Sequence, residues 1–406
     1  MDASFGEVLL VVGLLLFVAA ALSGVMHGTV LSSAVLSITL GIGLALPGVI
    51  EVDVGDAGVI ELVELALILT LISDGLVVDR ELLRVHWSPP TRALVLAMPI
   101  TLVLLALGAV ALFPELSWAE AFLLAAVLAP TDPVVTSTVV TARQVPSAIR
   151  HTLNLESGLN DGLALPFVLF FLVLATPGGD PGSEAAKLLG EAAFGALIGV
   201  ALGIAAGRLH HRVPGGGITA RYEGIYAVGL GLAAYGIADV TVGNGLIAAF
   251  VAAIALGAVE HQITERFIDF SENVSTIFQV MTFFVFGALI VSTGYNASVL
   301  ALIAFIPFAL LIARPAAVLL SLAGTRLPRP HKLFMAWFGP KGVASMLFAL
   351  LVLDEAVSNG PIVFDVAALV ILASILAHGL TDTVGANWID RHMSRTQAGQ
   401  PGVPTE

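Results

Sequence analysis

The chain has 406 residues, of which 58% are hydrophobic and 12% are charged, with a formal net charge of −13. A mean hydropathy of +0.99, together with a charged share about half that of ordinary globular domains, excludes a soluble globular protein. The sequence has no cysteine, which excludes disulfides and thiolate metal sites. It also has no basic block of the kind that binds nucleic acid. The composition therefore predicts an all-α polytopic membrane protein.

Apolar runs of about 17–25 residues, the length that spans a bilayer, recur along the whole chain. No Lys or Arg precedes the first run, which favours a first membrane span over a cleaved signal peptide. We expect thirteen transmembrane helices, at 6–27, 30–49, 57–78, 93–113, 119–140, 154–175, 186–207, 222–240, 242–258, 274–292, 298–322, 333–353 and 363–383.

The basic residues are distributed unevenly between the two sets of loops. Fourteen of the 17 Lys and Arg follow odd-numbered spans, one (Lys187) lies in the opposite loops, and two lie inside spans. Because positively charged loops stay in the cytoplasm, this bias predicts an N-terminus outside and a C-terminus in the cytoplasm of a cell membrane, inner or plasma. Residues 387–406 are predicted to form a short polar cytoplasmic tail without fixed structure.

Two predicted spans are interrupted near their middle. The fifth contains Ala129-Pro130-Thr131-Asp132-Pro133, and the twelfth contains Gly339-Pro340-Lys341-Gly342. An interior proline removes a helix hydrogen bond, so Pro130 is expected to free the carbonyl of Ala126, and Pro133 that of Ala129. An ionised Asp132 is costly in hydrocarbon, and broken backbone is tolerated there only where it lines a cavity. The fifth span is therefore predicted to carry a site.

The two interruptions also predict an inverted repeat. Spans 5 and 12 are seven apart, so they cross the membrane in opposite directions, as the paired broken helices of transporters do. The repeat would relate spans 1–6 to spans 8–13, with span 7 as a connector. The alternative is that Pro340 only kinks its helix, because proline is common in transmembrane helices.

Four polar residues open the sixth span: Glu156, Ser157, Asn160 and Asp161. Residues four apart share a helix face, which places Ser157 with Asp161, and Glu156 with Asn160 about 100° round the helix. The first face offers a hydroxyl and a carboxylate, which are oxygen ligands suited to a small monovalent cation or a proton. The second face offers groups that can meet a positive side chain.

Arg314 and Lys341 are the only Lys or Arg in the interior of the predicted spans, since Lys187 lies at the outer boundary of the seventh. Because buried charges are expected to pair, we predict an Arg314–Glu156 ion pair, which leaves Asp132 and Asp161 for a ligand. Lys341 is expected to offset either the charge of Asp132 or the carboxyl end of a half-helix. A purely structural role explains the Arg314–Glu156 pair equally well.

Two further polar residues leave alternatives open. Asp74, near the inner end of the third span, is consistent with a helix-end charge and with a residue on the ion pathway. For His378, packing is a better interpretation than a pH sensor, because a lone histidine in an apolar helix has no evident switching partner.

These motifs, taken together, resemble a known family. Thr131-Asp132-Pro133 followed by the run from Glu156 to Asp161 is similar to the monovalent cation:proton antiporters, the Na+/H+ exchanger family, of the prokaryotic type. The Asn160-Asp161 pair matches its electroneutral branch. The likeness continues through Phe270–Ser275, Arg314-Pro315 and Gly339–Gly342.

The resemblance implies a fold and an assembly. It implies an inverted repeat in which spans 5 and 12 are crossed, discontinuous helices, within a single transporter domain at 1–386. A core bundle (about 91–175 and 298–383) would slide against a dimerisation bundle (about 1–90 and 186–292) of a homodimer in the lipid bilayer.

The resemblance also implies roles for individual residues. It implies that Na+ is bound by Thr131, Asp132, Ser157 and Asp161. It also implies that the ion site is supported by the polar and charged side chains of Asn160, Glu156, Arg314 and Lys341. Much of the family has arginine where this chain has Lys341, and lysine lacks the planar fork of arginine, so a bidentate role there is in doubt.

The predicted activity is electroneutral exchange of one Na+ for one proton, without a cofactor and without enzymatic chemistry. Burial disfavours an ionised carboxylate, so protons and cations would compete, chiefly at Asp161, while Asn160 cannot ionise. Oxygen ligands alone do not separate Na+ from Li+ or K+. A cation channel and an intramembrane aspartyl protease are rivals, but the run from Gly158 to Asp161 lacks the Gly-x-Gly-Asp pattern of the protease.

Overall fold

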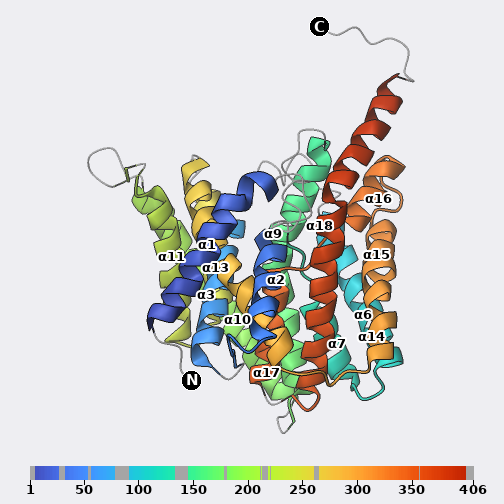
Figure 1. Ribbon diagram of the computed structural model, residues 1–406. Coiled ribbons are helices and arrows are strands. Elements are labelled where there is room, and N and C mark those ends of the chain that lie inside the picture. The colour runs from blue at the N-terminus through green and yellow to red at the C-terminus, as the bar shows by residue number, and fades with distance from the viewer. Residues whose placement is uncertain are drawn as a thin grey trace.

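The computed structural model describes residues 5–26, 33–53, 56–77, 91–132, 145–177, 181–210, 212, 218–219, 221–259, 265–355 and 357–398. In this part of the chain the regular structure is entirely helical, as predicted (Figure 1). The second half of the predicted fifth span, including Pro133, lies outside the described residues.

The first half of the chain forms a series of apolar helices that ends in a long one. Their order is α1 (Phe5–Met26), α2 (Ser33–Ala45), α3 (Ala57–Val77), the π-helix η1 (Ala93–Ala97), α6 (Met98–Leu112), α7 (Trp118–Val127) and α9 (Ser147–Ala175).

The second half contains a further π-helix and two short half-helices. The order is α10 (Pro181–His210), α11 (Glu223–Asp239), α12 (Gly245–Val259), α13 (Glu265–Ser292), α14 (Val299–Pro307), the π-helix η3 (Phe308–Ala313), α15 (Arg314–Ser321), α16 (Arg329–Trp337), α17 (Val343–Asp354) and α18 (Gly360–Ala398).

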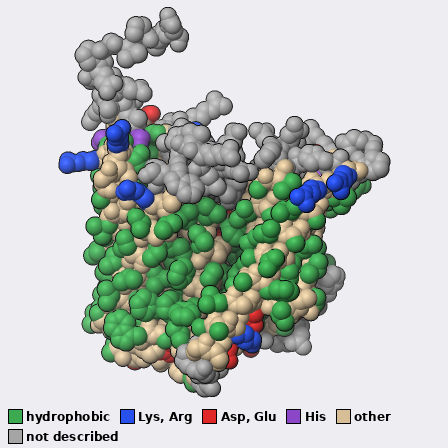
Figure 2. Space-filling model, turned by 180° about the vertical axis from the view of Figure 1, so that it is seen from behind, with side chains coloured by type: hydrophobic (Ala, Val, Ile, Leu, Met, Phe, Trp, Pro, Cys, Tyr) green, Lys and Arg blue, Asp and Glu red, His purple; other side chains and the backbone are tan. Residues whose placement is uncertain are grey.

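Six stretches of helix in the described residues are long and apolar enough to cross a membrane: Ala93–Leu112, Leu155–Ala175, Gly182–His210, Phe270–Ser292, Val299–Ser321 and Gly360–His392. On the face shown in Figure 2, hydrophobic side chains cover the region between the two ends of the molecule, and the visible Lys and Arg of the described residues lie towards those ends. The chain is therefore a helical membrane protein. Shorter apolar helices such as α2 and α12 occupy other predicted spans, so the count of thirteen stays a prediction.

The C-terminal helix corrects one expectation. The segment from residue 387 was predicted to lack structure, but α18 continues to Ala398. Its sequence is polar there, yet Ala386 and Ile389 are buried in a cluster with Phe334 and Leu322. A single apolar stripe on one face is enough to hold an otherwise polar helix in place.

The helix α7 begins with a capping box. The Ser117 hydroxyl accepts a hydrogen bond from Glu120 N (3.3 Å), and the Glu120 carboxylate accepts one from Ser117 N (2.8 Å), which satisfies two N–H groups that a helix start leaves unpaired. The same carboxylate accepts a hydrogen bond from Asn359 N (2.9 Å). The starts of α7 and α18 are thereby joined.

Two nonhelical segments interrupt the bundle. After α7 ends at Val127, residues 128–132 are not helical, and residues 338–342 separate α16 from α17. Both segments contain a proline, and the residue before a proline is disfavoured in the α conformation. The predicted break in the twelfth span is thus present, whereas the crossing of two broken helices and the inverted repeat stay predictions.

The helices fall into two groups by packing, although contacts also cross between them. The helices α2, α3 and α13 pack together, as do α10, α11 and α12; on the other side, α6 packs with α7, α15 with α16 and α17 with α18. The helices α9 and α17 both contact α3. The division into a core bundle and a dimerisation bundle therefore stays a prediction.

The close packing of α10 against α12 generates a test of the fold. A Cβ atom added at Gly199 of α10 would lie 2.6 Å from the Ala248 carbonyl oxygen of α12, whereas one added at Gly190 of the same helix meets nothing within 4 Å. We expect Gly199→Leu to lower the free energy of unfolding by about 1–3 kcal/mol through overpacking, and Gly190→Leu to leave it unchanged. Unfolding in detergent titrated with sodium dodecyl sulfate measures both, and equal effects would contradict the packing.

Candidate functional site

The two nonhelical segments contact one another directly. The backbone N–H of Asp132 donates to the carbonyl oxygen of Pro340 (2.9 Å). In the opposite direction, the Lys341 ammonium donates to the carbonyl oxygens of Pro130 (3.1 Å) and Ala129 (3.5 Å). Backbone groups released by one break are therefore paired by the other, which is the condition for broken backbone at membrane depth.

Lys341 lies at the carboxyl end of α7. Its side chain is buried, and its ammonium group contacts the carbonyls of Ala129 and Pro130 just beyond the end of α7, where a positive charge is favourable. This placement agrees with one of the two roles predicted for it. The expectation for Ala126 is wrong: its carbonyl is not free but accepts from Ala129 N (3.2 Å), because the last turn tightens into a 3₁₀-type bond.

Asp132 lies at the amino end of α17. Its carboxylate accepts a hydrogen bond from Val343 N (3.2 Å), the first residue of that half-helix, where negative charge is favourable. A Cβ atom on Gly342 would fall onto this carboxylate, so the position admits only glycine. The bond was not foreseen from the sequence, which left the Asp132 carboxylate entirely to a ligand.

Three side chains predicted for the site meet in a hydrogen-bonded group. The Asn160 amide donates to the Thr131 hydroxyl (2.6 Å), and that hydroxyl lies 3.3 Å from the Ser157 hydroxyl. All three residues are buried. Ser157 and Asn160 were expected on different faces of their helix, and Thr131 reaches both because it projects from the break rather than from a regular turn.

Two oxygens beside this group have no hydrogen-bond partner among the described residues. They are Oδ1 of Asp161 and Oδ1 of Asn160, and both residues are buried, at 3% and 2% exposed. Buried polar atoms nearly always have a partner in a folded protein. The Asp161 oxygen can take a proton or a cation, whereas the Asn160 amide oxygen can coordinate a cation but does not become protonated. Oxygen atoms of this kind are the ligands that hard cations prefer.

The predicted ion pair is present. Arg314 Nη2 lies 2.9 Å from Glu156 Oε1, and both side chains are buried. The same nitrogen donates to the Phe338 carbonyl (3.3 Å), at the carboxyl end of α16. The guanidinium lies so close to Gly339 that a Cβ atom there would overlap it. Each half-helix that ends at a break therefore has a cation at its carboxyl end.

Asp74, whose role the sequence left open, lies beside the site. The Cβ position of Gly158 on α9 is 3.6 Å from the Asp74 Cβ, and the charge of Asp74 interacts with those of Asp132 and Asp161. Its position inside an apolar span was the available signal, but only the packing of α3 against α9 shows which neighbours it has.

His378, a residue of α18, packs against the carboxyl end of α16, as expected. Its Nε2 is 2.9 Å from the Trp337 carbonyl oxygen, and its ring stacks on Trp337. Sequence reasoning missed Ser374, one turn earlier, whose hydroxyl accepts a hydrogen bond from Lys341 N (3.0 Å). The four-residue spacing of Ser374 and His378 was the one signal that linked them.

The arrangement defines a class of protein. Helix breaks that meet around buried carboxylates within an apolar bundle are characteristic of membrane transporters. The sequence model of the family described as sodium/hydrogen exchanger, transmembrane, matches residues 12–385. The chain therefore belongs to the sodium/hydrogen exchanger family, as its motifs indicated, and this is a family of secondary transporters rather than of enzymes.

Individual relatives are more distant. The K(+)/H(+) antiporter NhaP of Alkalimonas amylolytica is 25% identical over 349 residues, which cover 84% of this chain and 59% of that protein. The Na(+)/H(+) antiporter 2 of Zygosaccharomyces rouxii is 33% identical over 158 residues, 36% of this chain and 19% of that protein. This chain thus matches between about a fifth and three fifths of the length of these relatives.

A solved structure shares the fold. The sodium proton antiporter MjNhaP1 from Methanocaldococcus jannaschii, at pH 8, superposes with a TM-score of 0.73 at 18% identity, over 93% of this chain and 98% of that one. At this identity the likeness speaks for the fold alone.

The buried ion pair yields a prediction on stability. Glu156→Gln or Arg314→Gln alone leaves one buried charge without its partner and should cost about 3–5 kcal/mol, while the double variant should cost less than the sum. The exposed pair Lys187–Glu191 provides the control, because surface pairs contribute about 0–1 kcal/mol. A double-mutant cycle of unfolding in detergent measures the coupling; additive effects at the buried pair would refute it.

Proposed function

We propose that the protein exchanges one Na+ for one proton across the membrane, without net charge movement, by alternating access to Asp161. The observation that carries this proposal is the Asp161 carboxylate, whose Oδ1 is buried with no hydrogen-bond partner among the described residues. A group in this state gains a partner from either a proton or a cation, and the two compete because each neutralises the same buried charge.

Asp161 is a better carrier than Asp132 in this proposal. Asp132 already accepts a hydrogen bond from the start of α17, so it serves to hold the break as well as to attract the ion. Asn160, which precedes Asp161 in the chain, cannot ionise and donates a hydrogen bond to the Thr131 hydroxyl. One carboxylate then carries either one proton or one cation, which supports a one-for-one exchange.

The cation would be held by oxygen atoms of Thr131, Asp132, Ser157 and Asp161, and Asp74 adds a third carboxyl group nearby. Glu156, Arg314 and Lys341 would keep the two breaks in place whether or not the ion is bound. Lys341 does so by contacting two carbonyls in succession, a task that does not need the planar fork of arginine.

Alternating access would follow from an inverted repeat, in which one bundle moves against the other around the ion. Two features support the repeat. The π-helices η1 and η3 fall in the fourth and eleventh predicted spans, which the repeat pairs, and each is followed by a proline in the next turn, Pro99 and Pro315. A homodimer in the cell membrane, with the N-terminus outside and the C-terminus in the cytoplasm, completes the proposal.

K+ is the second candidate for the transported cation. Several relatives, including NhaP of Alkalimonas amylolytica, are named K(+)/H(+) antiporters. The relative from Zygosaccharomyces rouxii is named a Na(+)/H(+) antiporter. Oxygen ligands accept both ions, and the size of the site in the bound state decides between them.

The test uses proteoliposomes that contain a pH-sensitive dye. An imposed Na+ gradient should move protons without a signal from a voltage-sensitive dye, and Li+ and K+ gradients are compared in parallel. Asp161→Asn should reduce exchange to the level of empty liposomes, because the amide takes up no proton and carries no negative charge to balance a cation. The exposed Asp239→Asn is the control. Exchange that persists in Asp161→Asn would refute the assignment, and a voltage signal would refute electroneutrality.

A further inference from the structure

The linker between α13 and α14, residues 293–298, joins helices with different neighbours. The helix α13 packs mainly on α2, α3 and α11, whereas α14 packs on α6, η3 and α18. In the alternating-access mechanism proposed above, these two sets of helices move relative to one another. The linker must therefore absorb that movement, and its own contacts show where it does so.

The first residue of the linker belongs to α13. The backbone N–H of Thr293 donates to the Leu289 carbonyl (3.1 Å), and the Thr293 hydroxyl donates to the same oxygen (3.0 Å). Thr293 thus extends the hydrogen bonding of the helix by one residue and follows α13 in any movement.

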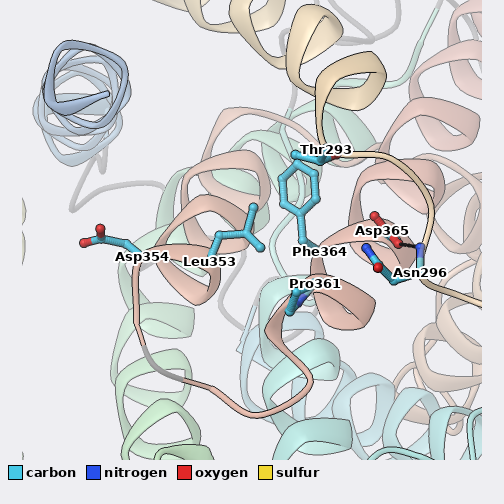
Figure 3. Close-up of a pocket in the computed structure, with 7 residues that line it drawn as sticks. All are labelled: Thr293, Asn296, Leu353, Asp354, Pro361, Phe364 and Asp365. Atoms are coloured by element: carbon cyan, nitrogen blue, oxygen red, sulfur yellow. Dashed lines mark hydrogen bonds between the residues drawn. The ribbon is translucent and has the colours of Figure 1, made fainter. Parts of the chain in front are cut away.

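The far end of the linker is fixed to α18. The Asp365 carboxylate, 3% exposed, accepts hydrogen bonds from the backbone N–H groups of Asn296 (2.5 Å) and Ala297 (3.2 Å) (Figure 3). Hydrogen bonds to a charged acceptor are about twice as strong as neutral ones. Asn296 and Ala297 therefore follow α18.

Only Gly294 and Tyr295 remain between these two anchors. Gly294 has a φ of +72° with nothing within 4 Å of its Cβ position, and Tyr295 is 63% exposed. Glycine occupies positive and negative φ about equally well, so this short piece can change its backbone angles without breaking a contact. Hinges commonly consist of a few such residues at the ends of elements.

A cavity of about 440 Å³ lies across this point. Thr293 lines it from the end of α13, and Leu353, Phe364 and Asp365 line it from α17 and α18 (Figure 3). The two sides of the cavity are therefore the two sides of the linker, and the space between them gives room for one side to approach the other.

We propose that Gly294 and Tyr295 form a hinge between the two sets of helices, and that Asp365 is a positioning residue that makes the chain from Asn296 onward move with α18. The inference rests on the proposed alternating access. It assigns no ion contact to Asp365, which acts through the linker backbone.

The first test is cross-linking across the hinge. The chain has no cysteine, so a bifunctional methanethiosulfonate reagent, which joins two cysteines through disulfides that a reductant cleaves, reacts only at introduced sites. A cross-link between Thr293→Cys and Leu353→Cys should lower exchange of Na+ or K+ for protons by about tenfold or more, an added barrier of about 1.4 kcal/mol, and a reductant should restore it. A cross-link between Asn296→Cys and Pro361→Cys, both beyond the hinge, should leave exchange within about twofold.

The outcomes of this test separate the hinge from the function. Exchange by the unmodified protein is measured first, and its absence with both cations overturns the proposed function. If the unmodified protein is active, tolerance of the Thr293–Leu353 cross-link overturns the hinge, and so does equal inhibition by the two cross-links.

A second test compares glycines with the same backbone conformation. Gly48 (φ +71°) and Gly324 (φ +75°) also have nothing within 4 Å of their Cβ positions, so Gly→Ala introduces the same local strain at all three sites. Gly294→Ala should lower the maximal exchange rate about fivefold or more with an unchanged apparent affinity for the cation. Gly48→Ala and Gly324→Ala should change neither quantity, and a similar loss at all three sites would overturn the proposal.

A third test addresses the positioning residue. Asp365→Ala removes both acceptors and should lower the maximal rate without changing the apparent cation affinity, the result expected of a conformational step. Asp365→Asn keeps one acceptor oxygen and should recover part of the rate. A change in cation affinity in either variant, or no recovery by asparagine relative to alanine, would overturn the role of Asp365.

Discussion

An interrupted helix inside a membrane leaves backbone carbonyl and N–H groups that lipid cannot pair, and the centre of this protein is organised by that constraint. Each unpaired end is matched by a side chain of opposite charge from another element. Lys341 serves the carboxyl end of α7, Arg314 that of α16, and Asp132 the amino end of α17. The partial charges of helix ends favour such partners. The helix ends at the breaks therefore stabilise the charged side chains, and the charged side chains stabilise the breaks.

The charges introduced in this way must themselves be balanced. Arg314 has Glu156 as its partner, and this pair forms without a ligand. Lys341 is surrounded by carbonyls and by the field of Asp161. Removing one partner of a buried ion pair costs more stability than the intact pair contributes, because the remaining charge is left unpaired. In the proposed mechanism the change of state falls on Asp161, whose Oδ1 has no hydrogen-bond partner among the described residues.

In the proposed alternating access, packing separates the helices that stay rigid from the linkers that change conformation. The helices α10 and α12 approach so closely at their glycines that no side chain fits between them, and Glu120 joins the starts of α7 and α18. By contrast, the linker after α13 is held at both ends and is free only around Gly294. Rigidity within each group of helices concentrates conformational change in the short linkers that connect them.

The sequence by itself determined the helical membrane class, the places where helices break, and the Arg314–Glu156 pair. These follow from local causes: the length of apolar runs, the geometry of proline, and the scarcity of charges inside the spans, which left Arg314 few possible partners. Only the tertiary structure decided that Lys341 meets Pro130, 211 residues away, that Ser374 supports Lys341, and that Asp365 holds the linker. Those contacts depend on how far each helix is rotated and how deep it sits relative to its neighbours. Neither quantity is contained in the periodicity of a single segment.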